Sequence, residues 1–310
     1  MQKKTGIHFL KNNEVNKDLW NDCIANSDHQ LIYAKTFYLD NISPKWSALT
    51  GANYEWVLPL TCRKKFGIAY LYQPPFTQQL GVFAKPGVEV PYTTIINYLQ
   101  QHYRFIECNW NYTSPLPAIA TAFEIKMATN FVLDLSRPYQ NIAANYKQDL
   151  VRNLKRSKRF DVVYKQTNDY KKCISLYHEY YSDRMPHVKQ SDYESFYNIC
   201  AYAEKHTMVI CREVTNTKNE LLATALLLHD GNRLYNLINV TTTEGRKAEA
   251  NHFLLDAVIK EFSGKDLLLD FEGSDLQGVK TFYQNFGGEN QPYYMLKYNR
   301  LPWPLRLFKQ

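Results

Sequence analysis

Apolar residues along the first half of the chain recur at spacings typical of a helix followed by strands. At residues 15–27 they lie three or four positions apart, which predicts an amphipathic helix. Residues 54–62 and 66–72 are rich in aromatic and aliphatic side chains and flank a short basic turn at 63–65, so we expect a β-hairpin there. The other predicted elements of this half are a helix at 92–102 and strands at 104–109 and 129–135.

A helix is predicted next at residues 138–159, and it carries a stripe of positive charge. Positions i, i+3, i+4 and i+7 of this segment share one helix face, and all four are basic. Such a stripe is either a solvated helix face or a binding surface for an anionic ligand, and both interpretations stay open. The four residues of this basic stripe are Arg152, Lys155, Arg156 and Arg159.

The second half of the chain has clearer boundaries between elements. Asp230 and Gly231 predict a tight hairpin turn, because both residues tolerate positive φ. Helices are predicted at 170–184, 191–206, 245–262 and 277–285, and strands at 207–214, 221–229, 233–240, 267–272 and 291–298. This order favours an α+β fold in which a mixed, mostly antiparallel sheet is flanked by helices.

The first half repeats the element order of the second half in a looser form. A chain of 310 residues is long enough to bury two cores. We therefore expect two tandem units, one at residues 1–138 and one at residues 139–310, with the chemistry in the second.

Composition narrows the class of protein. Hydrophobic residues make up 45% of the chain and charged residues 22%, which is the balance of a folded protein. The six cysteines include no C-x-x-C pair and no Cys/His cluster, which argues against a metal site and favours a reducing, cytoplasmic location. No apolar stretch approaches the ~20 residues of a transmembrane helix. The formal net charge of +7 is concentrated at 147–159 and 297–310, where it can attract an anionic ligand.

Several motifs occur in an order that resembles one family. The turn at 241–250 and the run Phe-Tyr-Gln-Asn-Phe-Gly at 282–287 look like the GNAT acyltransferase fold. The whole chain resembles the FemAB-like branch, whose members join two such units; the similar segments are 132–136, 152–160 and 269–274. This resemblance implies transfer of an acyl or aminoacyl group to an amine, with an acyl-CoA such as acetyl-CoA or an aminoacyl-tRNA as the donor.

The resemblance also implies a donor site at the turn before the helix of 245–262. A helix N-terminus offers backbone N–H groups and a positive dipole end to a pyrophosphate. Glu249 stands where the family has its central glycine, and its carboxylate opposes a phosphate there. An ordinary helix start and an unsplayed central strand are the alternatives. The residues implied for donor binding are Gly245, Arg246, Lys247, Ala248 and Ala250, and Ile238, Asn239 and Val240 for a pantetheine arm.

Three residues near the end of the chain are candidates for the chemistry. Tyr283 matches the position of a tyrosine that protonates the departing thiolate in relatives, and a phenol of pKa about 10 suits that role. Asp270 and Glu272 lie two positions apart on a predicted strand, so they face the same side. Because burying two carboxylates is costly, at least one should face the active-site cleft and accept a proton from the amine or hold its ammonium group. A structural salt bridge or a helix cap is the alternative.

Further predictions concern the residues that contact the acceptor and the overall mechanism. Arg184 and His187 occupy the loop that lies on the acceptor side in this fold, although a loop histidine is more often simply exposed. The acceptor is expected to be an amine-bearing small molecule, peptide or cell-wall precursor, attacked directly because no G-x-S-x-G nucleophile motif is present. The competing function is a non-catalytic module that binds nucleic acid or a glycan, with the basic stripe as its contact surface.

Overall fold

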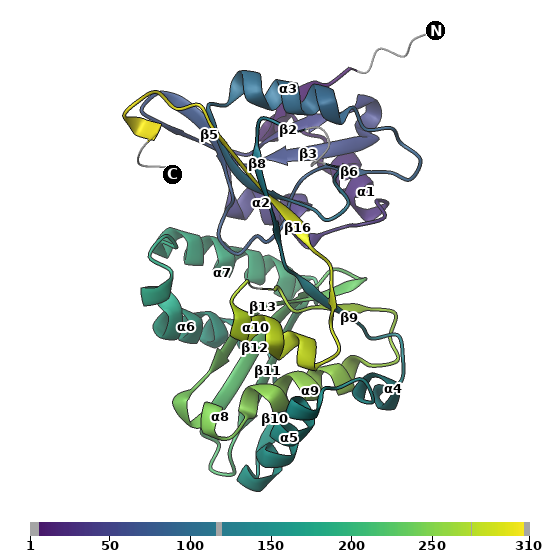
Figure 1. The fold of residues 1–310 in the computed structure, drawn as a ribbon, viewed down its shortest axis with the longest axis vertical. Coiled ribbons are helices and arrows are strands. Elements are labelled where there is room, and N and C mark those ends of the chain that lie inside the picture. Colours follow the sequence, from purple (N-terminus) through teal and green to yellow (C-terminus); the bar gives the residue numbers. More distant parts are fainter. Residues whose placement is uncertain (1–5, 116–119, 274, 307–310) are drawn as a thin grey trace. The chain divides into compact units, whose positions relative to one another are not determined.

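The chain forms two compact units, seen in a computed structural model that describes residues 6–115, 120–273 and 275–306 (Figure 1). The N-terminal unit comprises Met1–Ala128 and Pro292–Gln310, and the C-terminal unit comprises Thr129–Gln291. These limits differ from the predicted boundary after residue 138, and the last strand belongs to the first unit instead of the second. Ser274 and the end of the basic tail at 307–310 lie outside the described residues.

Within its described residues, the N-terminal unit contains two sheets and three α-helices. A four-stranded antiparallel sheet has the order β1-β2-β3-β6, and a five-stranded mixed sheet has the order β4-β5-β7-β16-β8. The elements are β1 (His8–Lys11), α1 (Lys17–Ala25), α2 (Thr36–Ile42), β2 (Ser47–Thr50), β3 (Trp56–Leu60), β4 (Cys62–Lys65), β5 (Ile68–Tyr72), β6 (Phe83–Ala84), α3 (Tyr92–His102), β7 (Phe105–Trp110), β8 (Glu124–Ala128) and β16 (Tyr293–Asn299).

The predicted hairpin of this unit exists, but its turn lies elsewhere. The basic residues 63–65 are part of β4 and pair with β5, so the turn is formed by Phe66 and Gly67. The composition of Arg63, Lys64 and Lys65 suggested a turn, yet all three are extended because the ladder to β5 satisfies their backbone groups.

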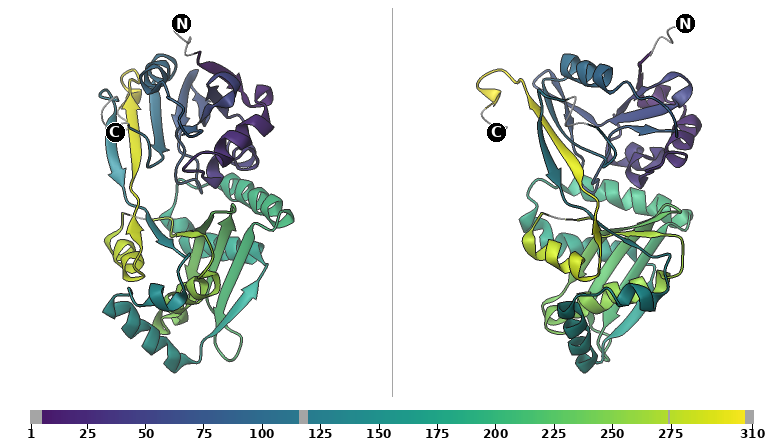
Figure 2. Two further views of the ribbon diagram at one scale, coloured as in Figure 1. Left: turned by 90° about the vertical axis from the view of Figure 1, so that its right-hand side faces the viewer. Right: turned by 45° about the vertical axis from the view of Figure 1, so that its right-hand side comes forward.

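The C-terminal unit has one seven-stranded sheet with helices on both faces (Figures 1 and 2). Its strand order is β10-β11-β12-β13-β14-β9-β15, and β13 and β14 form its one recorded parallel pair. The elements are β9 (Phe131–Asp134), α4 (Tyr139–Ala143), α5 (Gln148–Ser157), β10 (Val163–Thr167), α6 (Tyr170–Tyr181), α7 (Gln190–Lys205), β11 (Val209–Thr215), β12 (Leu221–His229), β13 (Arg233–Thr241), α8 (Thr243–Lys247), α9 (Ala250–Phe262), β14 (Leu268–Asp270), α10 (Gln277–Asn285) and β15 (Glu289–Asn290).

The core of this unit explains the helix positions. Ala223, Ala225 and Leu227 alternate along β12 and contribute to the cluster beneath α9, whereas Thr224 faces α6 and bonds to Cys173. Helices α6 and α7 therefore cover one face, and α9, with α5 packed on it, covers the other. Among the described residues, no helix has both the length and the apolar character that crossing a bilayer requires.

The single helix predicted at 138–159 is divided into α4 and α5. The chain turns at residues 144–147, where the Lys147 N–H donates to the carbonyl of Asn285 at 2.9 Å. Helix α5 ends at Ser157, and Arg159 lies in the following 3-10 turn Lys158–Phe160. The basic stripe is therefore shorter than predicted, because only three of its residues are on one helix.

Candidate functional site

The short strand β14 pairs along its whole length with the first three residues of β13. Their parallel pairing covers 233–235 of β13, and among the described residues no strand pairs with 236–241 on that side. Between the pairs Ile238 with Leu226 and Tyr235 with Leu228, β13 spans three residues while β12 spans two. The extra residue forms a β-bulge, which bends a strand and increases its twist. This bulge accounts for the divergence, which leaves backbone N–H and C=O groups of β13 without a strand partner.

Asn236 is the first residue of β13 beyond that pairing. It is 4% exposed, and neither atom of its side-chain amide has a hydrogen-bond partner among the described residues. A buried amide without partners is costly, so such a group is a candidate contact for a ligand. Sequence reasoning missed Asn236, because only the bulge distinguishes it from an ordinary strand asparagine.

A cavity of about 300 Å³ lies at the other end of the unpaired stretch of β13. The cavity is lined by residues from the end of α6, the end of β13, the segment from α8 to the start of α9, and α10. Its lining residues are Tyr181, Thr241, Gly245, Arg246, Glu249, Ala250, Asn251, His252 and Phe282. Three of the residues implied for donor binding are in this set, namely Gly245, Arg246 and Ala250. Lys247 and Ala248 are not. Tyr181 carried no sequence signal, and Phe282 belongs to the family-like run at 282–287 but was not predicted to line the site.

Gly245 is required by packing. A Cβ at this position would lie 1.9 Å from the carbonyl oxygen of Leu222 on β12. Its N–H donates to the hydroxyl of Thr242 at 2.9 Å, so this donor already has a partner. The glycine therefore allows α8 to approach the sheet closely, and it does not leave a free N–H for a phosphate.

Glu249 is the N-cap of α9 and is held by two side chains. Its φ of +54° lies in the left-handed region that favours glycine, and its carboxylate is 13% exposed. One carboxylate oxygen lies 2.9 Å from Nη1 of Arg156, and the other lies 3.0 Å from Nδ1 of His252. Asn153 Nδ2 lies 3.1 Å from Nε2 of the same imidazole. A negative group is thus held beside the first turn of α9, although it makes no capping hydrogen bond to the helix backbone.

The imidazole of His252 is enclosed within this network. Burial lowers the pKa of His252 below its ordinary value, although Glu249 opposes the shift. The neutral tautomer with a proton on Nδ1 fits both contacts, because Nδ1 then donates to Glu249 and Nε2 accepts from Asn153. The network therefore keeps the Glu249 carboxylate in one orientation at neutral pH.

Tyr283 lies on α10 and is half-buried. Its ring stacks on Phe271 with centroids 4.8 Å apart and planes at 22°. Burial, reinforced by the charge of Glu272, raises the pKa of Tyr283 above its ordinary value. The phenol is consequently protonated at neutral pH and can donate a proton.

The two predicted carboxylates have different surroundings. Asp270 is 1% exposed, accepts from Nη1 of Arg233 at 2.7 Å and from Nδ2 of Asn130 at 3.2 Å, and also accepts from the Glu272 N–H at 3.0 Å. This geometry favours the structural salt bridge that the sequence left open. Glu272 is half-buried, and its φ of +56° ends the strand alternation, so the two carboxylates do not share a face as predicted.

The remaining predicted residues lie at the edges of the site or away from it. Ile238 and Val240 are buried side chains of β13. Arg184 and His187 are exposed, and the Arg184 guanidinium lies 5.6 Å from the ring centre of Tyr181. Within the basic stripe, Arg152 pairs with Asp149 and Arg156 pairs with Glu249, so two of its four cations already have carboxylate partners.

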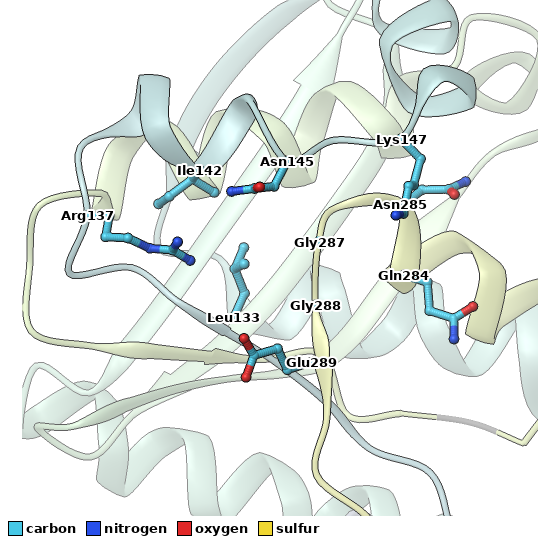
Figure 3. A pocket seen from close by; sticks show the side chains of 10 residues that line it. All are labelled: Leu133, Arg137, Ile142, Asn145, Lys147, Gln284, Asn285, Gly287, Gly288 and Glu289. Atoms are coloured by element: carbon cyan, nitrogen blue, oxygen red, sulfur yellow. The ribbon is translucent and has the colours of Figure 1, made fainter.

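A second cavity of about 620 Å³ lies at the C-terminal end of α10, against β9 and α4 (Figure 3). The side chain of Arg137 points into it, whereas those of Lys147 and Gln284 point away. Its lining residues are Leu133, Arg137, Ile142, Asn145, Lys147, Gln284, Asn285, Gly287, Gly288 and Glu289. None of the predicted site residues lines this larger cavity, so we do not assign the candidate active site to it.

Known structures share this fold, although neither a family model nor a curated protein matches the chain. FemX aligns with a TM-score of 0.67 and 11% identity over 97% of this chain and 99% of FemX. The C-terminal domain of a putative lysylphosphatidylglycerol synthetase from Agrobacterium fabrum aligns with a TM-score of 0.55 and 9% identity over 96% of this chain and 95% of that chain. L-PGS from Bacillus licheniformis aligns with a TM-score of 0.52 and 9% identity over 94% and 93%. The predicted α+β fold with two units is therefore confirmed, and it is the fold of FemX.

Proposed function

We propose that the C-terminal unit transfers an acyl group from a carrier to an amine, at the opening where β13 diverges from β14. The observation that carries this proposal is the unpaired stretch of β13, which joins the bulge at Asn236 to the cavity at the start of α9. Its six residues extend over about 17 Å at ~3.3 Å per residue. An extended arm that pairs with this stretch can therefore connect a carrier in the cavity to an acyl group at the bulge.

The carrier that suits this cavity is an aminoacyl-tRNA more than an acyl-CoA. The pyrophosphate of CoA would need the helix N-terminus at which the Glu249 carboxylate is fixed. A phosphate there would also have to compete with the Glu249 carboxylate for Arg156. The ester-linked end of a tRNA has no pyrophosphate, and exposed cations such as Lys155 and Arg159 are available for its backbone.

Tyr283 and Glu272 have the chemistry for the two proton transfers. The acceptor nitrogen attacks the ester carbonyl, the new C–N bond forms, and the C–O bond to the carrier breaks. Glu272 takes the proton that the amine loses, and Tyr283 donates one to the departing oxygen. Asp270 acts only by holding Arg233 and the end of β14 in position.

The acceptor is proposed at the level of its chemical class. An amine on a small molecule, a peptide or a cell-wall precursor fits direct attack at the bulge. The name of the putative lysylphosphatidylglycerol synthetase above refers to the attachment of lysine to a lipid, which adds a lipid headgroup to these candidates. Arg184 and His187, exposed near Tyr181, are the proposed acceptor contacts.

The choice of donor is tested by thermal unfolding with saturating acetyl-CoA or an aminoacyl-tRNA pool. A ligand at ~100 times its dissociation constant stabilises the fold by roughly 2.7 kcal/mol, which moves the midpoint by several degrees. The wild-type protein should respond to aminoacyl-tRNA only. Glu249→Gln should gain a response to acetyl-CoA, because it removes the charge and keeps the shape. The matched control is Glu244→Gln, which removes an exposed carboxylate of α8 and should gain nothing.

Two results would contradict the proposal at different levels. Stabilisation of the wild-type protein by acetyl-CoA would overturn the choice of donor and leave acyl transfer in place. Stabilisation by neither donor would overturn the transferase function and favour a non-catalytic binding module.

A further inference from the structure

Two loops leave the same end of the five-stranded sheet in the N-terminal unit (Figure 1). Tyr70 of β5 pairs with Phe105 of β7, and Phe105 pairs with Asn299 of β16. The turn that precedes β5 and the segment that follows β16 therefore lie beyond the same end of the strands. We call this part of the surface the sheet tip; it comprises residues 63–67 and 300–306.

Phe66 at the sheet tip has a strained backbone and an exposed ring. Its φ is +52° and that of Gly67 is +77°, the combination for which two-residue hairpins usually have Asn-Gly. The left-handed region costs a bulky residue roughly 1–2 kcal/mol. No burial compensates this cost, since Phe66 is 76% exposed and its recorded ring contact is with Nζ of Lys65 at 5.4 Å. A strained residue that gives the fold nothing in return points to a role outside the fold.

Trp303, on the second loop, is also a large aromatic residue with an exposed ring. It is 80% exposed and lies four residues after the end of β16. Two large exposed aromatic side chains thus lie on loops at the same end of the sheet, next to strands that are separated only by β7. Exposed aromatic residues that gather in this way are typical of interaction surfaces.

The sheet tip is also positively charged. Neither residues 62–68 nor residues 299–306 include an acidic residue. Among the described residues, no ion pair is recorded for Lys64, Lys65, Arg300 or Arg306, and all four are exposed. The partner that complements this surface is therefore anionic as well as able to accept aromatic rings.

We propose that the sheet tip binds the surface of an anionic lipid bilayer, with Phe66 and Trp303 inserted at the headgroup level. Aromatic rings favour that depth, and basic residues near the surface are attracted to anionic headgroups. A bilayer suits this shape better than a nucleic acid, because the rings project from loop ends and do not form a platform along a groove on which successive bases stack. The backbone strain at Phe66 follows from this role, since insertion requires an apolar side chain at the very end of the hairpin.

The test is co-flotation of the full chain with phosphatidylcholine vesicles, with and without phosphatidylglycerol. The wild-type protein should float with the anionic vesicles, less so at high salt, and not with phosphatidylcholine alone. Phe66→Asn is the informative variant, because asparagine suits the left-handed turn. It should melt no lower than the wild-type protein and yet bind about tenfold less tightly. Trp303→Ser should weaken binding to a similar degree.

The matched control is Met127→Ser. Met127 is 70% exposed on β8 of the same sheet, and it pairs with Tyr294, five residues along β16 from Asn299. This variant should bind vesicles as the wild-type protein does. The proposal is overturned if Phe66→Asn binds vesicles normally, if Met127→Ser weakens binding equally, or if Phe66 is needed for binding to RNA while vesicles are not bound.

Discussion

Charged and polar side chains have different surroundings at the two ends of the contact between β13 and β14. At the closed end, where the strands pair, Arg233 and Asp270 have side chains 5% and 1% exposed and satisfy each other. At the open end, Glu272 and Tyr283 are half-buried, and the amide of Asn236 has no partner among the described residues. The distance along the chain between Asp270 and Glu272 is only two residues.

This contrast indicates that the position of a carboxylate relative to the strand pairing decides whether it serves the fold or the chemistry. A fully paired, buried charge has no capacity left to bind a proton or a substrate, and it serves the fold. Glu272 is only half-buried, and its charge acts on the phenol of Tyr283, so we assign the proton transfer to this carboxylate and not to Asp270. The two ends can be separated experimentally, since changes at the closed end should affect stability and changes at the open end should affect rate.

The largest effect is expected at the closed end. Asp270→Asn leaves the guanidinium of Arg233 buried without its counter-charge, which typically costs 3–5 kcal/mol. The free energy of unfolding, measured in urea, should fall by about this amount. The double variant Arg233→Met with Asp270→Leu removes both charges and should recover most of the loss. If Asp270→Asn instead unfolds like the wild-type protein and loses only activity, Asp270 belongs to the catalytic machinery.

The next effect is expected at the open end. Tyr283→Phe removes the proposed proton donor while keeping the stack on Phe271, so the rate of transfer should fall by about 10²–10⁴-fold with little change in melting temperature. Tyr139→Phe is the matched control, because this tyrosine bonds to Asp256 at 2.8 Å elsewhere in the unit and should not affect the rate. Equal rates for Tyr283→Phe and the wild-type protein would remove Tyr283 from the mechanism.

The smallest effect is a pH dependence at the start of α9. The folded state lowers the pKa of His252 below its ordinary value of 6.5, so the unfolded chain binds the proton more readily. The contribution of His252 to stability is therefore fully present above pH 6.5 and is lost as the pH falls through the lowered value. Urea unfolding across this range should show less pH dependence for His252→Gln than for the wild-type protein. The same slope in both proteins would exclude His252 as the titrating group.

The accuracy of the predictions from sequence differs between elements. Helix α3 lies where predicted, because its apolar periodicity reports on which local face is buried. The single helix predicted at 245–262 is instead divided into α8 and α9, because the positive φ of Glu249 interrupts it. The turn at Phe66 and Gly67 was misplaced, because phenylalanine is not a usual turn residue and the adjacent basic run looked more polar. The lining residues Gly245, Arg246 and Ala250 were predicted through the family motif, whereas Asn236, His252 and Phe282 were not.

The sequence by itself determined the order and type of most elements, the α+β class and the segment that lines the cavity at the start of α9. Each of these depends on residues that are neighbours along the chain, so local periodicity and turn chemistry report on them directly. Only the tertiary structure decided that β16 joins the first unit, that β13 bulges away from β14, and that Asp270 is fully buried beside Arg233 while Glu272 is half-buried. These features depend on partners from distant parts of the chain, such as Arg233 for Asp270 and Arg156 for Glu249, and residue spacing does not encode such pairings.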